Sequence, residues 1–158
     1  MSALNTLVDG YYTLTVGTVK YPMRSIIDLQ LQADFARWNF ERAVDDLAYA
    51  RKLYTEAEFE AERQKLREDF RKGLFGFKSK RGAEAMTSLP GLTFICARLI
   101  EGVDEITVMQ VLVDGVEQAK ELLKEIITDS FPELRSTIKK KEVMTATVKP
   151  KKNRRQRN

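Results

Sequence analysis

One continuous stretch of this sequence, residues 89–134, most constrains what the chain can fold into. It reads LPGLTFICARLIEGVDEITVMQVLVDGVEQAKELLKEIITDSFPEL. The part up to Gly102 is apolar on nearly all sides, which predicts a fully buried helix, and Pro90 suits its first turn. The part after it carries an apolar stripe at helical spacing and stops at Phe131 and Pro132. The stretch therefore predicts a helical hairpin with one wide apolar face.

Three positions in this stretch carry further expectations. Asp104 or Thr107 is expected to cap the second helix. Gly115 lies inside that helix, where glycine costs roughly 1 kcal/mol relative to alanine, so we expect another helix to approach closely there. Cys96 is the single cysteine of the chain, which excludes an internal disulfide. Its apolar neighbours predict a buried thiol.

The N-terminal part of the chain has a different pattern. Residues 11–23 alternate apolar and polar side chains around Gly17, which predicts a β-hairpin with glycine in the turn. A long helical pattern follows, and Ser25 with Asp28 resembles a capping box at its start. Trp38 falls on the apolar row of this helix and is interpreted as a core anchor.

A second helical pattern follows a predicted break near Tyr54. Thr55 and Glu58 have the spacing of a capping box. Residues 56–72 are mostly charged, with opposite charges at i, i+3 and i, i+4, which is typical of an exposed helix. Gly73 is expected to end it.

Length and charge set the domain organisation. With 158 residues, the chain is predicted to form one mainly α domain over residues 11–134, with the β-hairpin at its N-terminal end. Residues 1–10 are expected to be a flexible leader. Ten of the 27 basic residues but one of the 23 acidic residues lie in 135–158, so the net charge is −5 before this segment and +9 within it. This composition predicts a disordered basic tail.

The composition also argues against most catalytic chemistry. The sequence contains no histidine, which removes Ser–His and Cys–His nucleophile pairs and imidazole metal ligands. One cysteine cannot form a zinc cluster. The chain is therefore expected to be a non-enzymatic binding protein without a cofactor or metal. Neither a signal peptide nor a membrane-spanning run of about 18 apolar residues is expected.

Two groups of residues are candidates for contact with a nucleic acid or an acidic partner. In the first, aromatic rings alternate with basic groups, as base stacking with phosphate neutralisation requires; it comprises Phe75, Phe77, Lys78, Lys80 and Arg81. The favoured alternative is a loop whose phenylalanines return to the core and leave a basic rim. The second group lies in the tail and comprises Lys149, Lys151, Lys152, Arg154, Arg155 and Arg157. Its alternative interpretation is a solubilising tail.

The helical hairpin supplies the candidate partner-binding face. Apolar grooves between the β-hairpin and the last helix could accept extended or helical partners. The residues predicted to contact a partner are Leu92, Leu99, Val108, Leu112, Val116 and Leu123.

The order of these elements resembles a known family. A short hairpin, TLTVGTVKYPMR, leads directly into the helix that begins SIIDLQL. Later, LTFICARLIEG is followed by a D-x-x-T link and by VMQVLVDGVEQAKELLKEII. Over roughly residues 11–35 and 89–130, this layout resembles the small tail assembly chaperones of long-tailed bacteriophages. The charged segment 55–81 departs from the shortest family members.

The resemblance implies a specific role. Such a chaperone binds the long helical tape-measure protein in the host cytoplasm and keeps it soluble until tail-tube subunits polymerise around it.

A second copy of the chain is a further candidate partner. Two alternatives remain: a small nucleic-acid-binding regulator that uses residues 75–81 and the basic tail, and a structural connector or scaffold component of the virion.

Overall fold

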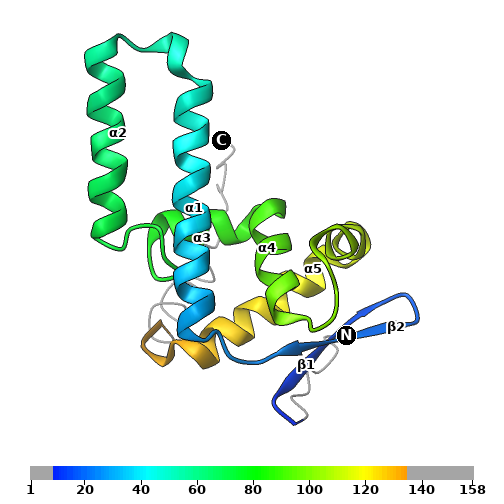
Figure 1. Ribbon diagram of the computed structural model, residues 1–158. Coiled ribbons are helices and arrows are strands. Elements are labelled where there is room, and N and C mark those ends of the chain that lie inside the picture. Colours follow the sequence, from blue (N-terminus) through cyan, green and yellow to red (C-terminus); the bar gives the residue numbers. More distant parts are fainter. Residues whose placement is uncertain (1–8, 135–158) are drawn as a thin grey trace, which may run out of the picture.

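The computed structural model describes residues 9–134, and it confirms a mainly α fold with an N-terminal β-hairpin (Figure 1). The expected tail at 135–158 and most of the expected leader lie outside these residues. The strands are β1 (Tyr11–Val16) and β2 (Val19–Arg24), and the helices are α1 (Leu29–Tyr49), α2 (Glu56–Arg71), α3 (Lys80–Thr87), α4 (Leu89–Leu99) and α5 (Glu105–Ser130). Short 3-10 turns lie at Arg51–Leu53 and Pro132–Leu134.

The β-hairpin is the predicted one, and it lies against α5. Its strands are antiparallel, with Val16 opposite Val19, and Gly17 takes a φ of 62° in the turn. Alternate side chains, including Leu14 and Met23, point into the core and are fully buried. One face of the hairpin is therefore stabilised by burial against the helices, which a two-stranded sheet needs.

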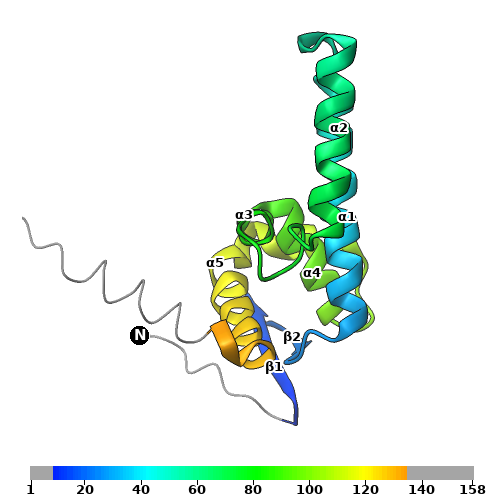
Figure 2. The same cartoon turned by 90° about the vertical axis from the view of Figure 1, so that its left-hand side faces the viewer.

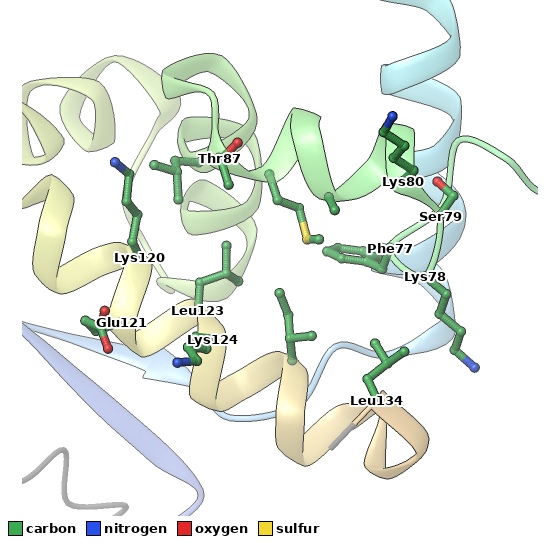
Figure 3. Close-up of a pocket in the computed structure, with 14 residues that line it drawn as sticks. Phe77, Lys78, Ser79, Lys80, Thr87, Lys120, Glu121, Leu123, Lys124 and Leu134 are labelled. Atoms are coloured by element: carbon green, nitrogen blue, oxygen red, sulfur yellow. The ribbon is translucent and has the colours of Figure 1, made fainter. Parts of the chain in front are cut away.

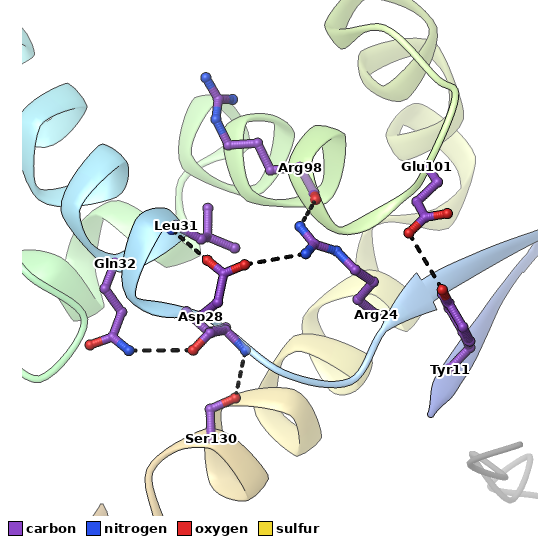
Figure 4. A network of polar contacts seen from close by, with 9 residues as sticks. Tyr11, Arg24, Asp28, Leu31, Gln32, Arg98, Glu101 and Ser130 are labelled. Carbon is purple, nitrogen blue, oxygen red and sulfur yellow. Dashed lines mark hydrogen bonds and ion pairs between the residues drawn. The ribbon is translucent and has the colours of Figure 1, made fainter. Parts of the chain in front are cut away.

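The first helix starts later than the sequence predicts, because Ser25 is not its cap. The Ser25 backbone N–H donates to the Gly10 carbonyl at 3.1 Å, and that of Ile27 donates to the Ser130 hydroxyl at 2.9 Å. These long-range hydrogen bonds hold residues 25–27 in an irregular linker between β2 and α1. Figure 4 shows the bond that Ser130 accepts. Asp28 is the N-cap, and its carboxylate accepts from the Leu31 N–H at 2.7 Å.

Helices α1 and α2 form an antiparallel arm that projects away from the rest of the molecule (Figures 1 and 2). The predicted capping box at the start of α2 is confirmed: Thr55 accepts from the Glu58 N–H, and the Glu58 carboxylate accepts from the Thr55 N–H at 2.8 Å. Gly73, with a φ of 75°, follows α2 as expected. The arm closes at its base around a phenylalanine cluster, in which the Phe40 and Phe70 ring centroids are 4.6 Å apart.

The predicted helical hairpin of α4 and α5 forms the centre of the core. Cys96 is fully buried in α4, and Asp104 caps α5 by accepting from the Thr107 N–H at 2.8 Å. Helix α4 ends at Leu99, before Gly102, because Ile100 leaves the helix to form an antiparallel bridge with Met23 of β2. This bridge ties the edge of the β-hairpin to the helical hairpin.

The expectation that a helix approaches Gly115 is wrong. The neighbour is Val16 of β1, which lies so close that a Cβ built on Gly115 would stand 2.6 Å from the Val16 Cγ2 atom. The β-hairpin therefore occupies the position on α5 that the sequence assigns to a helix.

Candidate partner-binding groove

The residues predicted to contact a partner form the intramolecular core. Five of the six are buried in the folded chain: Leu92, Leu99, Val108, Leu112 and Leu123. The sixth, Val116, is half-buried and packs against the same core. These side chains do not form a free binding face in the folded chain, because the β-hairpin and α4 cover the apolar side of α5.

The phenylalanines of the predicted stacking loop are also in the core. Phe75 and Phe77 have exposed fractions of 0% and 4%. The Phe77 ring stacks on Phe35, with centroids 4.3 Å apart, and the Phe75 ring meets Phe40 edge-on at 5.5 Å. Neither ring presents a face on which a base could stack, so this part of the nucleic-acid interpretation is corrected. The favoured alternative, a loop whose phenylalanines return to the core, describes the fold.

The cations of this loop remain at the surface and have acidic neighbours. Lys78 forms an ion pair with Glu133, and Lys80 lies 4.0 Å from a carboxylate oxygen of Glu84. Arg81 lies 3.8 Å from Asp69 and stacks its guanidinium over the Phe75 ring at 4.6 Å. The six candidate cations of the tail, Lys149, Lys151, Lys152, Arg154, Arg155 and Arg157, lie outside the described residues.

A groove between α3 and α5 is the feature of the surface best suited to a partner (Figure 3). It has a volume of about 650 Å³ and is open to solvent on one side. Its floor is apolar and is formed by Phe77, Met86, Leu92, Leu123, Ile127 and Leu134. Two of the residues predicted to bind a partner, Leu92 and Leu123, thus contribute to this floor, while their side chains remain largely in the core.

Local sequence rules explain where α3, one wall of the groove, and α4 begin. Ser79 caps α3 by accepting from the Gly82 N–H at 2.9 Å, and Ser88 caps α4 by accepting from the Gly91 N–H at 3.2 Å. Each cap starts a new helix, so the chain turns twice within ten residues. Glycine is required after each cap, because a Cβ on Gly82 or Gly91 would stand 1.9 Å from a backbone oxygen of the preceding turn. Helix α3 is thereby held over α4, alongside the C-terminal half of α5.

Lysines form the rim of the groove. Lys120 and Lys124 lie one helical turn apart on α5, and Lys78 and Lys80 lie on the opposite side, before and at the start of α3 (Figure 3). Glu121 is the one acidic residue in the lining. Lys120 is paired with Glu117 at 3.1 Å, an exposed residue that does not line the groove. The groove thus combines an apolar floor with a mainly cationic rim.

The groove itself was not predicted, although part of its pattern is visible in the sequence. Leu123 and Ile127 repeat at i, i+4 beside Lys120 and Lys124, so this face of α5 is apolar with cationic flanks. The opposite wall comes from α3, about 40 residues earlier in the chain. That two such segments face each other is set by contacts remote in sequence.

Other apolar side chains are exposed without forming a groove. Ile106, Met109 and Val113 lie along one side of the N-terminal half of α5, and Tyr49 and Leu53 lie at the tip of the arm. Exposed apolar side chains mark a binding site only where they form a large contiguous patch.

Cys96, the single cysteine of the chain, lies in the core. Burial raises the pKa of the Cys96 thiol to about 12, so the thiolate that would be the nucleophile does not form near neutral pH. Among residues 9–134, no group of three or more acidic or cysteine side chains is placed to hold a metal ion. No helix within this range has the length and apolar character that a membrane crossing needs.

No family model, no curated protein and no solved structure matches this chain. A functional conclusion therefore rests on the groove and on the order of elements along the chain.

Proposed function

We propose that this protein is a non-enzymatic binding protein that holds a helical segment of another protein in the groove between α3 and α5. The observation that carries this proposal is the groove itself, in whose apolar floor Met86, Ile127 and Leu134 are only partly buried. Apolar grooves of this kind accept the apolar face of an amphipathic helix.

The dimensions of the groove support a helical occupant. Helix α3, which forms one wall, has 8 residues and is therefore about 12 Å long, enough to contact roughly two turns of a bound helix. Two turns place about three apolar side chains on one face, at i, i+3 or i+4, and i+7. Burying each such side chain contributes about 1.5–3 kcal/mol before the entropy of association is subtracted. One groove therefore supports a moderate and reversible affinity, as a protein that holds a partner temporarily requires.

The specific role proposed is that of a tail assembly chaperone, for which the support is the resemblance in element order. The partner would be the long, mostly helical tape-measure protein, which such a chaperone keeps soluble until tail-tube subunits surround it. The proposed setting is the host cytoplasm.

Co-expression with a long helical tape-measure protein tests the proposal. We expect the two proteins to co-elute in size-exclusion chromatography, and the partner to be insoluble when expressed alone. Ala83 is exposed and lines the groove, so Ala83→Trp should fill the groove and abolish co-elution. The matched control is Ala61→Trp, at an exposed position of α2 away from the groove.

The outcomes separate the alternatives. Elution of this chain alone, with a partner that is soluble without it, would contradict the chaperone role. Equal co-elution of Ala83→Trp, Ala61→Trp and the unmodified chain would place the binding site elsewhere.

A further inference from the structure

We propose that the groove between α3 and α5 selects an amphipathic helix whose polar flanks are acidic. This inference rests on the proposed function, since it specifies the helix that the groove would hold. The structural basis is the lining, in which four lysines and one glutamate surround an apolar floor.

The lysines lie on both sides of the groove. Lys120 and Lys124 project from α5, whereas Lys80 projects from the start of α3 (Figure 3). A helix lying on the floor between the two walls would therefore have a cationic group beside each of its flanks. Because Lys120 and Lys124 are spaced i, i+4, carboxylates at i, i+4 on the bound helix would match their spacing of about one turn.

The lysines can exchange their present carboxylate partners for carboxylates of a bound helix. Lys80 pairs with Glu84, Lys120 with Glu117, and Lys78 with Glu133. None of these three carboxylates is part of the groove lining. All three ion pairs are substantially exposed, and exposed ion pairs contribute little to stability. A lysine can also lay its methylene chain along the apolar face of a bound helix while its ammonium group reaches the flank.

Charge argues against two other occupants. A basic amphipathic helix would bring cations toward Lys120 and Lys124 and would be repelled. The chain's own segment 135–158 follows directly from Leu134 at the groove, but with ten basic residues and one acidic residue it has the same sign of charge as the rim. An acidic helix from a separate chain is the occupant whose charge is complementary.

Three labelled peptides test the inference with the full chain. They share one amphipathic helical sequence with leucines on the apolar face, and they carry Glu, Gln or Lys at the flanking positions. We expect fluorescence anisotropy to show the Glu peptide binding about threefold to tenfold tighter than the Gln peptide, as a few exposed charge pairs allow. The Lys peptide should bind weakest, and the preference for Glu should shrink at high salt.

Variants of the protein identify the source of the preference. The double variant Lys120→Gln, Lys124→Gln should bind the Glu peptide only as tightly as the Gln peptide. Its affinity for the Gln peptide should equal that of the unmodified protein. The matched control is Lys65→Gln with Lys72→Gln on α2, where both side chains are exposed and outside the groove. This control should leave all three affinities unchanged.

Failure of this inference can be told apart from failure of the proposed function. Equal binding of the Glu and Gln peptides, with both abolished by Ala83→Trp, would overturn the acidic preference and leave the helix-binding groove in place. Binding that Ala83→Trp does not affect would overturn both. If the double variant Lys120→Gln, Lys124→Gln still prefers the Glu peptide, these two lysines are not the source of the preference.

Discussion

Gly115 of α5 and Val16 of β1 are in direct contact, and the contact leaves no room for a side chain on the helix. A Cβ at Gly115 would lie 2.6 Å from the Val16 Cγ2 atom, whereas the next nearest atom, Cδ1 of Leu14, would be at an ordinary 3.7 Å. The glycine thus allows the β-hairpin to pack onto α5, and a single valine sets the limit of approach.

We therefore expect Gly115→Ala to destabilise the protein by about 1–2 kcal/mol, because the valine or the hairpin must shift. In a Val16→Ala background the clash is removed, and the helix propensity of alanine should then make Gly115→Ala stabilising by up to about 1 kcal/mol. Denaturant unfolding of the four proteins of this double-mutant cycle measures both effects. The same sign of change in both backgrounds would contradict the proposed contact.

A buried amide holds the loop between α2 and α3 to helix α1. Asn39 is buried, and its Nδ2 atom donates to the Phe75 carbonyl oxygen at 3.1 Å. Asn39→Leu keeps the approximate size but leaves that carbonyl unpaired, so we expect a loss of about 1–3 kcal/mol in the free energy of unfolding. Fluorescence of Trp38, the single tryptophan of the chain, monitors the transition. Gln30→Leu, an exposed change on the same helix, is the control and should have a much smaller effect.

The Tyr12 hydroxyl donates to the Asp129 carboxylate at 2.7 Å and joins β1 to the end of α5. Burial, the hydrogen bond to Asp129 and the negative charges of Asp129 and Glu125 raise the pKa of Tyr12 from 10.0 to about 12. Between these values the folded state keeps a proton that the unfolded chain releases. The free energy of unfolding should therefore decrease as the pH rises from about 10 to about 12.

Tyr12→Phe should make this decrease shallower, whereas Tyr49→Phe, at a fully exposed position of the arm, should not. The measurement is unfolding at a series of alkaline pH values, with tyrosinate absorbance to follow ionisation. An identical pH slope in Tyr12→Phe and in the unmodified protein would refute the assignment.

The capping box gives the projecting arm its own local stability. Thr55→Ala removes the hydroxyl that caps α2, and we expect a loss of about 1 kcal/mol, seen as faster amide hydrogen exchange in the first turns of α2. The hydrogen bonds from the Thr55 backbone and side chain lower the pKa of Glu58. The contribution of this carboxylate is thus present above its ordinary pKa and is lost as the pH falls through the lowered value. An NMR titration should show the Glu58 pKa moving toward its usual value in Thr55→Ala, and Thr18→Ala in the hairpin turn should leave it unchanged.

The Cys96 thiol should be unreactive in the folded protein. It is fully buried, and burial raises its pKa to about 12. We expect a thiol-specific disulfide reagent to modify Cys96 only as the chain unfolds, so that the rate rises with denaturant in parallel with the loss of Trp38 fluorescence. Rapid modification in native buffer would show that α4 opens without global unfolding.

The sequence by itself determined the features that depend on residues near one another. The turn at Gly17, the break before Thr55, the capping box with Glu58 and the cap at Asp104 are all confirmed, because each is governed by interactions within a few residues. Burial of α4 and of the apolar stripe of α5 was also predictable, because an apolar surface of that width must be covered.

Only the tertiary structure decided what covers that surface and what remains open. Ser25 satisfies the local rule for a cap but is held in the linker by its hydrogen bond to Gly10. The neighbour of Gly115 is a strand, and the rings of Phe75 and Phe77 turn into the core. The groove exists because α3 and α5, distant in sequence, face each other with an apolar floor between them. Such pairings depend on the summed packing of the whole chain, and no local pattern carries that information.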